Sequence, residues 1–257
     1  MKKKIDIVKN WLARYTGQAL EDFGRYILLT NFQNYVQMFA DLHNVPVVGR
    51  KKSMPCATAE NITIINFGMG SPNAATVMDL LTAIKPKACL FLGKCGGLKH
   101  VSELGDFILP IAAIRGEGTS NDYMPNEIPA LPAFSLQKSV SSTMNRQYDL
   151  DYWTGTVYTT NRRVWEHDKD FKKYLRKVRC IAIDMETATI FTVGFANHIP
   201  TGALLLVSDQ PMTPEGVKTS KSDAFVTQNY VELHLKVGID SLKQLINDGR
   251  TVKHLKF

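Results

Sequence analysis

Two segments of the sequence place carboxylates directly after short apolar runs. In CIAIDMETATIFTVGF, residues 180–195, Asp184 and Glu186 follow such a run, and in ALLLVSDQ, residues 203–210, Asp209 does the same. Burial raises the pKa of a carboxyl group, so a buried Asp can stay protonated and act as a general acid. A second carboxylate can stabilise positive charge that develops in a transition state. On spacing alone, Asp209 fits a turn residue ahead of Pro211 equally well.

Small residues follow several other apolar runs. In open α/β sheets, ligands bind beyond the carboxyl ends of the strands. Glycine lets backbone N–H groups approach a ligand closely, and a helix that begins near Asn73 would point its N-terminus at an anion. Strand-to-helix turns need glycine in any case, so each glycine pair alone is weak evidence. The segments concerned are FGMGSPN (67–73), GKCGG (93–97) and RGEGT (115–119).

Short β-type runs alternate with helical patterns along the chain, and this alternation must position the carboxylates. Several of the β-type runs are nearly all apolar, as expected for strands that are covered on both faces. We expect strands at residues 26–30, 62–67, 88–93, 107–114, 155–159, 180–184 and 202–208. We expect helices at residues 31–42, 73–84, 171–177, 186–197 and 224–246.

This alternation predicts an α/β fold, a three-layer sandwich around a central, largely parallel mixed sheet. Two long loops interrupt the pattern, at residues 115–135 and 208–223. Loops of this length in a compact domain are usually functional or disordered, and the apolar content of the first argues against disorder. The sequence shows no internal repeat and no linker, so we expect residues 1–257 to form one domain.

Bulk properties exclude several classes of protein. No apolar run approaches the roughly 18 residues that span a bilayer, and no apolar segment follows the basic residues at the N-terminus, so we expect neither a membrane span nor a signal peptide. The four cysteines show no CxxC pairing, which favours reduced thiols and a cytoplasmic location. The net charge of +7 is compatible with a phosphorylated substrate. No helix carries the basic stripe of a nucleic-acid-binding protein, and the six scattered histidines predict no metal site. We expect no cofactor.

Five segments in order resemble the nucleoside phosphorylase and nucleosidase superfamily. They are FGMGSPNAATVMDLL, FLGKCGGL, GEGTS, IDMETAT and LLLVSDQP, and the likeness extends from about residue 25 to about residue 246. Within the superfamily, ARYTG, YILLTNFQNYV, EIPALP and GTVYTTNRRVWE look most like the AMP nucleosidase branch. This resemblance implies a nucleoside phosphorylase-like fold, hydrolysis of AMP to adenine and ribose 5-phosphate, and a homohexamer.

The resemblance also implies roles for the carboxylates. Glu186 would accept hydrogen bonds from the ribose 2′- and 3′-hydroxyls, Met185 would pack on the sugar, and Asp209 would protonate N7 of adenine as the glycosidic bond breaks. Asp184 is interpreted as structural. Trp165 and Phe134 are candidates for stacking on adenine, although each fits packing in a core or loop at least as well. The other predicted substrate-binding residues are Asn31, Gln33, Gly70, Lys94, Cys95, Gly96, Arg115, Arg163 and Ser208.

Departures from the superfamily pattern bear on the nucleophile. Hexameric phosphorylases carry a phosphate-binding Arg just before the Gly-x-Cys-Gly turn, where this sequence has Phe91, and their N-terminal phosphate loop is absent. Water is therefore favoured over phosphate. Methylthioadenosine nucleosidases hold that water with a Glu after the first strand, which is also missing here. Asn31, Gln33 and Glu186 remain alternative holders of the water.

Several choices stay open at this point. The 5′-phosphate could be held by any of six basic residues, which are Arg14, Arg50, Lys51, Lys94, Arg115 and Arg163. The alternative function is a purine nucleoside phosphorylase or nucleosidase that acts on an unphosphorylated nucleoside. A nucleotide-binding module without turnover is disfavoured by the joint presence of Glu186 and Asp209.

Overall fold

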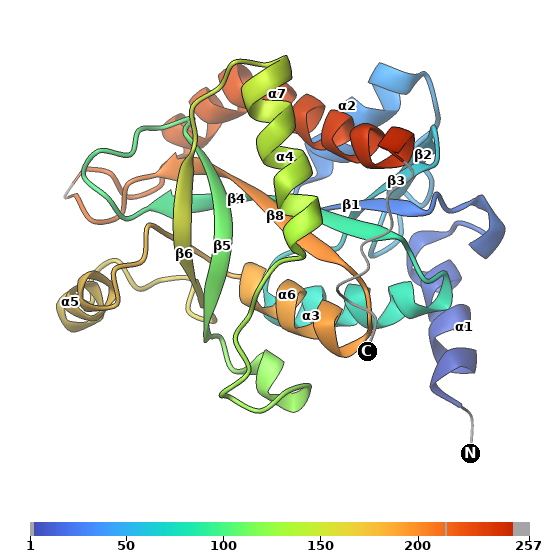
Figure 1. Ribbon diagram of the computed structural model, residues 1–257, viewed down its shortest axis with the longest axis horizontal. Helices are drawn as coiled ribbons and strands as arrows, with labels where there is room; N and C mark the ends of the chain where they lie inside the picture. The colour runs from blue at the N-terminus through green and yellow to red at the C-terminus, as the bar shows by residue number, and fades with distance from the viewer. Residues whose placement is uncertain (1–2, 214, 249–257) are drawn as a thin grey trace.

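The fold consists of one mixed sheet with helices on both faces, as the computed structural model in Figure 1 shows. The structure describes residues 3–213 and 215–248. The first two residues of the basic N-terminal segment lie outside this part. The strands are β1 (Tyr26–Thr30), β2 (Cys56–Ala59), β3 (Ile62–Asn66), β4 (Ala88–Gly97), β5 (Phe107–Gly116), β6 (Trp153–Thr160), β7 (Ala182–Asp184) and β8 (Thr201–Asp209). The α-helices are α1 (Lys4–Thr16), α2 (Gln33–His43), α3 (Ser71–Leu80), α4 (Phe134–Gln147), α5 (Lys169–Lys177), α6 (Thr187–Ala196) and α7 (Ser220–Asp248).

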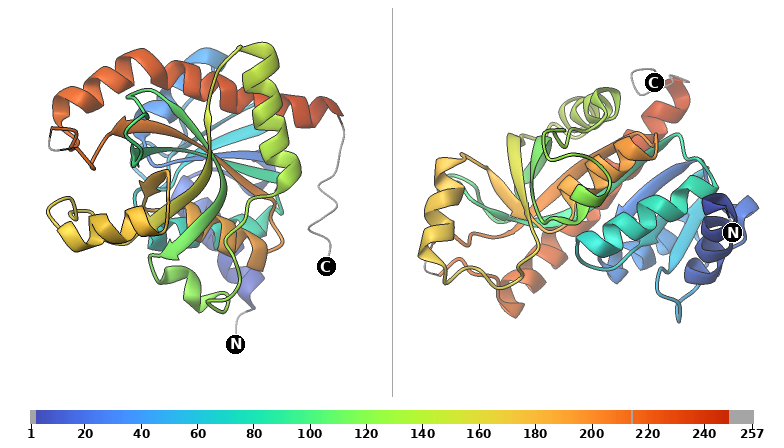
Figure 2. Two further views of the ribbon diagram at one scale, coloured as in Figure 1. Left: turned by 60° about the vertical axis from the view of Figure 1, so that its left-hand side comes forward. Right: turned by 90° about the horizontal axis from the view of Figure 1, so that it is seen from below.

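The sheet is mostly parallel and partly closed on itself. Its strand order is β2-β3-β1-β4-β7-β6-β5-β8, and β8 also pairs in parallel with β4. The pairs β2–β3, β4–β7 and β5–β8 are antiparallel, and the other pairs are parallel. Figure 2 shows that the strands of this sheet are strongly twisted. The predicted three-layer α/β sandwich with a largely parallel mixed sheet is confirmed.

Two hydrophobic cores correspond to the two helical layers. In Figure 1, α2, α4 and α7 cover one face of the sheet, and α1, α3 and α6 cover the other. Phe39, Leu136 and Leu235 belong to the first core, whereas Leu12, Met78 and Phe191 belong to the second. Strands β1, β4 and β8 are buried along their whole length, because both faces are covered. Helix α5 lies apart from both layers, beyond β6 (Figure 1).

The sequence prediction omitted three elements: α1, β2 and α4. Helix α4 overlaps the end of the predicted loop 115–135, and the rest of that loop contains the short turn of 3₁₀-helix Thr119–Asp122. Three buried residues, Leu136, Val140 and Met144, lie four positions apart on α4, which is helical spacing. Loop 208–223 is shorter than predicted, because β8 extends to Asp209 and α7 begins at Ser220. No helix in residues 3–213 and 215–248 combines the length and apolarity needed to cross a membrane.

Candidate active site

A pocket opens where strands β1, β4, β6, β7 and β8 end, at the edge of the sheet where α/β folds bind ligands. Both predicted carboxylates, Glu186 and Asp209, line it. They come from separate strand ends and meet because β4 lies beside both β7 and β8. The pocket is also lined by Asn31, Phe32, Met69, Lys94, Cys95, Gly96, Thr160, Arg162, Arg163, Trp165, Glu166, Ile183, Asp184, Met185, Ser208 and Lys218.

Glu186 is held in place by backbone donors. It is 2% exposed, its Oε1 accepts a 2.7 Å hydrogen bond from the N–H of Gly70, and its Oε2 accepts one of 3.3 Å from Met185. The side-chain amide of Asn31 donates a further hydrogen bond to the carboxylate. Burial and the neighbouring Asp184 raise the pKa of Glu186 to about 8, against the effect of these donors. A carboxylate with this pKa can accept a proton near neutral pH.

Asp184 fixes the loop that carries Glu186. Its carboxylate accepts hydrogen bonds from the Thr159 hydroxyl at 2.7 Å, from the Thr187 N–H at 2.7 Å and from the Glu186 N–H at 3.2 Å. These donors lie at the end of β6 and at the start of α6, so Asp184 ties the two elements together. Burial raises the pKa of Asp184, and the donors partly offset this effect. The contacts agree with the interpretation of Asp184 as structural, although the residue also lines the pocket.

Asp209 ends β8 on the other side of β4. The Ser208 hydroxyl donates a 2.7 Å hydrogen bond to Asp209 Oδ1. Burial raises the pKa of Asp209, whereas Ser208, Lys218 and Arg163 act in the opposite direction. A β-bulge in the β4–β8 pairing places Gly96 opposite Asp209. A Cβ at Gly96 would lie 3.2 Å from Asp209 Oδ2 and 2.9 Å from Pro211, so a side chain at position 96 would crowd Asp209.

A partly buried ion-pair cluster joins the pocket to the first turn of α7. Nζ of Lys94, whose side chain is 3% exposed, lies 2.8 Å from Asp223 Oδ1 and donates a 2.8 Å hydrogen bond to Thr227. Nζ of Lys218 lies 3.0 Å from the same carboxylate oxygen. Both ammonium groups face the Phe32 ring, at 4.8 and 5.8 Å from its centroid. Burial lowers the pKa of Lys94, and Asp223 opposes this effect.

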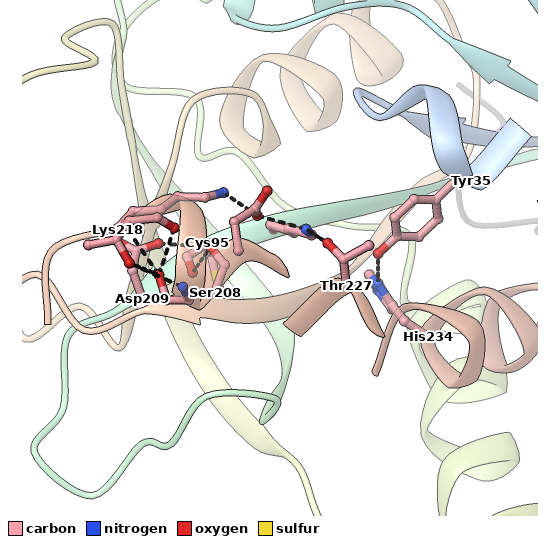
Figure 3. A network of polar contacts seen from close by, with 11 residues as sticks. Tyr35, Cys95, Ser208, Asp209, Lys218, Thr227 and His234 are labelled. Carbon is pink, nitrogen blue, oxygen red and sulfur yellow. Dashed lines mark hydrogen bonds and ion pairs between the residues drawn. The ribbon is translucent and has the colours of Figure 1, made fainter. Parts of the chain in front are cut away.

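Further along α7, Tyr35 and His234 form a second buried contact, which Figure 3 shows beside the pocket network. His234 Nδ1 lies 2.8 Å from the Tyr35 hydroxyl, and Nε2 lies 2.9 Å from the carbonyl oxygen of Leu204. Because a carbonyl only accepts, Nε2 carries the proton and Nδ1 accepts from Tyr35. Burial lowers the pKa of His234 to about 3, so the ring is neutral. The contact fixes α2, α7 and β8 behind the pocket.

The segment after β6 supplies the remaining wall of the pocket. Trp165 is 4% exposed and packs edge-to-face on Phe171, with 5.4 Å between ring centroids. Nη1 of Arg163 lies 3.5 Å from Glu166, and Nη2 of Arg162 lies 2.8 Å from Asp168. Trp165 therefore lines the pocket from a packed position, and Arg162 and Arg163 of the same segment line it as well.

Some predicted site residues lie elsewhere. The guanidinium of Arg115 does not reach the pocket, because it binds inside its own loop to Ser120, Asn121 and the carbonyls of Met124, Pro125 and Ile128. These contacts stabilise the loop, and the expected contact of Arg115 with a substrate is not formed at this pocket. Gln33 lines a separate surface hollow, where its Oε1 accepts a 3.2 Å hydrogen bond from Asn66.

Two more predicted site residues, Gly70 and Phe134, do not line the pocket themselves. Gly70 contributes its N–H to Glu186 and does not itself line the pocket. Phe134 is 73% exposed at the start of α4 and lines a different hollow, so only Trp165 of the two aromatic candidates lies at the pocket. Of the six basic candidates for the 5′-phosphate, Lys94 and Arg163 line the pocket, and Arg14, Arg50, Lys51 and Arg115 do not.

Sequence reasoning missed several residues of the pocket. Lys218 lies in the long loop after β8, where a buried strand leads into a polar segment, so its position could have been inferred. Phe32 follows the candidate Asn31 directly. The others lie inside the segments that carry the family resemblance but were not singled out within them; they are Met69, Thr160, Arg162, Glu166 and Ile183. Within the described part of the chain, no group of three His, Cys, Asp or Glu side chains is arranged to hold a metal ion.

Comparison with known proteins identifies the class of protein. The family model of the Phosphorylase superfamily matches residues 25–243, and the chain belongs to this family. The chain is similar to AMP nucleosidase of Escherichia coli K12, with 28% identity over 96% of this chain and 60% of that protein. It therefore spans about 60% of the length of the two curated AMP nucleosidases of Escherichia coli that it matches. It is also similar to uridine phosphorylase of Treponema pallidum, with 23% identity over 90% of this chain and 93% of that one.

A solved structure gives the more specific comparison. The crystal structure of AMP nucleosidase from Bacteroides thetaiotaomicron is 56% identical, has a TM-score of 0.87, and is matched over 96% of this chain and 99% of that chain. A uridine phosphorylase from Vibrio fischeri shares the fold at 23% identity, with a TM-score of 0.77. The resemblance inferred from the sequence motifs, including that to the AMP nucleosidase branch, is confirmed.

Proposed function

We propose that the protein hydrolyses the N-glycosidic bond of AMP to give adenine and ribose 5-phosphate. The observation that carries this proposal is the meeting of two buried carboxyl groups, Glu186 and Asp209, in one pocket beside cationic side chains. The likeness to AMP nucleosidases, above all to the protein that is 56% identical, supports AMP as the substrate.

The two carboxyl groups have complementary tasks in this proposal. Asp209, whose pKa is raised by burial, donates a proton to N7 of adenine and so removes negative charge from the departing base. Glu186 accepts hydrogen bonds from the ribose hydroxyls and stabilises the oxocarbenium-like sugar. Met185 packs on the sugar, and Trp165 stacks on the base. Cys95, Gly96 and Ser208 form the floor around Asp209.

Water is the nucleophile in this proposal. Phe91, which stands where phosphorylases carry an Arg, is fully buried and packs on Phe67 with 5.7 Å between ring centroids. It offers no donor to a phosphate ion. A phosphate co-substrate would thus lack one of its expected ligands.

The 5′-phosphate is assigned to the cationic part of the pocket. Four basic residues line it: Lys94, Arg162, Arg163 and Lys218. Each is already paired with a carboxylate, so the phosphate of AMP would enter a set of charges that is organised in advance. Charge-assisted hydrogen bonds to a phosphate are stronger than those between neutral groups.

Three broader expectations belong to the same proposal. Residues 1–257 act as one catalytic domain, the protein works in the cytoplasm, and it assembles as a homohexamer by resemblance to the superfamily. Light scattering on the purified protein measures the oligomeric mass, and a monomer would contradict the last point.

One assay tests the proposed reaction. AMP and adenosine are incubated separately with the enzyme, with and without inorganic phosphate, and the sugar product is identified. Ribose 5-phosphate from AMP in phosphate-free buffer, with adenosine poorly used, supports the proposal. Strict dependence on phosphate, with ribose 1-phosphate formed from adenosine, would contradict it and favour a phosphorylase.

A further inference from the structure

Asn31 carries a buried acceptor without a partner in the pocket. The residue follows the last residue of β1 and lines the pocket beside Glu186. Its Oδ1 is buried and has no hydrogen-bond partner in the part of the chain that the structure describes. An unpaired buried acceptor is unfavourable unless a ligand or a water molecule pairs with it. This oxygen therefore marks a position for a donor that enters the pocket.

The other end of the same amide is already in use. The N–H of the Asn31 side chain donates to the Glu186 carboxylate, which fixes the amide so that Oδ1 faces away from that contact. Gly70 and Met185 each donate to one oxygen of Glu186 and so hold the carboxylate still. Asn31 Oδ1 and the Glu186 carboxylate thus form a rigid pair of neighbouring acceptors.

The position of Asn31 relative to Asp209 fits a nucleophile site. Strand β4 lies between β1 and β8, so Asn31 and Asp209 end strands on opposite sides of β4. Two strand spacings amount to about 10 Å, which leaves room for a sugar between the residues. In an in-line displacement, water attacks the face of the sugar opposite to the departing base. The pair Asn31–Glu186 lies across the pocket from the acid that protonates the base.

Gln33, the rival candidate, lacks this geometry. Its side chain is bonded to Asn66 and lines the hollow beside α2. Glu186 on its own could accept a hydrogen bond from the water, but the buried Oδ1 of Asn31 would then still lack a partner.

We propose that Asn31 and Glu186 together hold the attacking water, with Asn31 as the residue that positions it. This inference rests on the proposed hydrolysis of AMP. One O–H of the water donates to Asn31 Oδ1 and the other to Glu186. The water oxygen forms a bond to C1′ while the C1′–N9 bond breaks and its electron pair leaves with adenine. Asp209 gives a proton to N7, and the water loses a proton to Glu186, whose raised pKa suits this task.

The experiment uses competition between two nucleophiles. Water satisfies both acceptors, whereas methanol has a single O–H and satisfies only one. AMP is hydrolysed in a water–methanol mixture, and ribose 5-phosphate and its methyl glycoside are quantified for the wild type, Asn31→Ala and Gln33→Ala. In Asn31→Ala we expect kcat to fall about 10²-fold with KM for AMP nearly unchanged. The methyl glycoside to ribose 5-phosphate ratio should rise about tenfold, because the acceptor that excludes methanol is gone. Gln33→Ala should behave as the wild type.

The outcomes separate this inference from the proposed function. If the wild type does not release ribose 5-phosphate from AMP, the proposed function fails. If the wild type does so and Asn31→Ala keeps its kcat and its product ratio, the role of Asn31 alone is overturned. In a third outcome, KM for AMP rises in Asn31→Ala, discrimination against 2′-deoxy-AMP is lost, and the product ratio is unchanged. Asn31 would then bind a ribose hydroxyl instead of the water. The product ratio does not depend on the amount of folded enzyme, so it remains decisive if the variant is less stable.

Discussion

The backbone N–H of Gly70 donates a 2.7 Å hydrogen bond to Oε1 of Glu186, across 116 positions of sequence. Gly70 caps the start of α3 with φ of 93° and ψ of 158°, a conformation that residues with a side chain rarely adopt. The turn before α3 therefore orients the carboxylate that follows β7. A glycine at the start of a helix thus holds a carboxylate that follows a distant strand.

We predict that Gly70→Ala lowers kcat/KM for AMP by more than about tenfold, because the strained backbone would move its N–H away from Glu186. A new Cβ would meet only Pro72, at 3.9 Å, so the effect comes from backbone strain and not from a clash. Gly118→Ala is the matched control, since Gly118 has φ of 83° and open space around its Cβ position. Both variants should lose about 1–3 kcal/mol of unfolding free energy in denaturant titrations. Equal kcat/KM in the two variants would contradict the role of Gly70.

The sequence predicted the sheet well because buried strands are continuous apolar runs. The predicted strand 26–30 agrees with β1 at both ends, and the predicted strand 88–93 is the first part of β4. The glycine-rich continuation of β4 has no apolar pattern, although it is fully buried, so its end could not be placed. The closure of the sheet through β4 and β8 depends on long-range pairing and leaves no local signal.

The sequence could predict only those pocket residues that lie at or directly after the ends of strands. Glu186 and Asp209 end apolar runs, and their approach to one pocket follows from the sheet. Arg115 also lies at a strand end, but its guanidinium donates hydrogen bonds to five groups of its own loop. The spacing of residues along the sequence cannot predict these contacts. Lys218 reaches the pocket from a loop, and its pairing with Asp223 depends on where α7 begins.

The raised pKa of Glu186 predicts a distinctive pH profile. Burial and Asp184 raise this pKa to about 8, and the proposed role requires the ionised form. Below this pKa the ionised fraction falls, so kcat/KM should rise about tenfold per pH unit up to pH about 8. Glu186→Gln should be slower and should lose this limb, because Gln does not titrate. Measurement of kcat/KM from pH about 5 to about 9 for both proteins checks this, and a limb retained in the variant would assign it to another group.

Lys218 is expected to discriminate between AMP and adenosine. Its Nζ lies beside Asp223 at the pocket, where it can turn to the 5′-phosphate. Loss of one charge-assisted hydrogen bond, about 1.5–3 kcal/mol, should raise KM for AMP about 10–100-fold in Lys218→Met. KM for adenosine should stay nearly constant. Lys236→Met removes the same charge from a surface pair with Glu232 on α7 and serves as control. An equal rise in KM for both substrates would exclude a phosphate contact.

Asp209→Asn tests the general acid directly. The amide keeps the size of the side chain and can still pair with the Ser208 hydroxyl, but it has no proton to transfer to N7. We expect kcat to fall by about 10²–10⁴-fold while the dissociation constant for AMP changes little. Ser208→Ala is the matched comparison. It removes a hydrogen bond that favours the ionised form of Asp209, so it should raise the pKa of Asp209 and keep this acid protonated to a higher pH. Calorimetric binding of AMP to Asp209→Asn, followed by single-turnover release of adenine, separates binding from chemistry. A near-normal rate of adenine release in this variant would return Asp209 to the alternative of a turn residue ahead of Pro211.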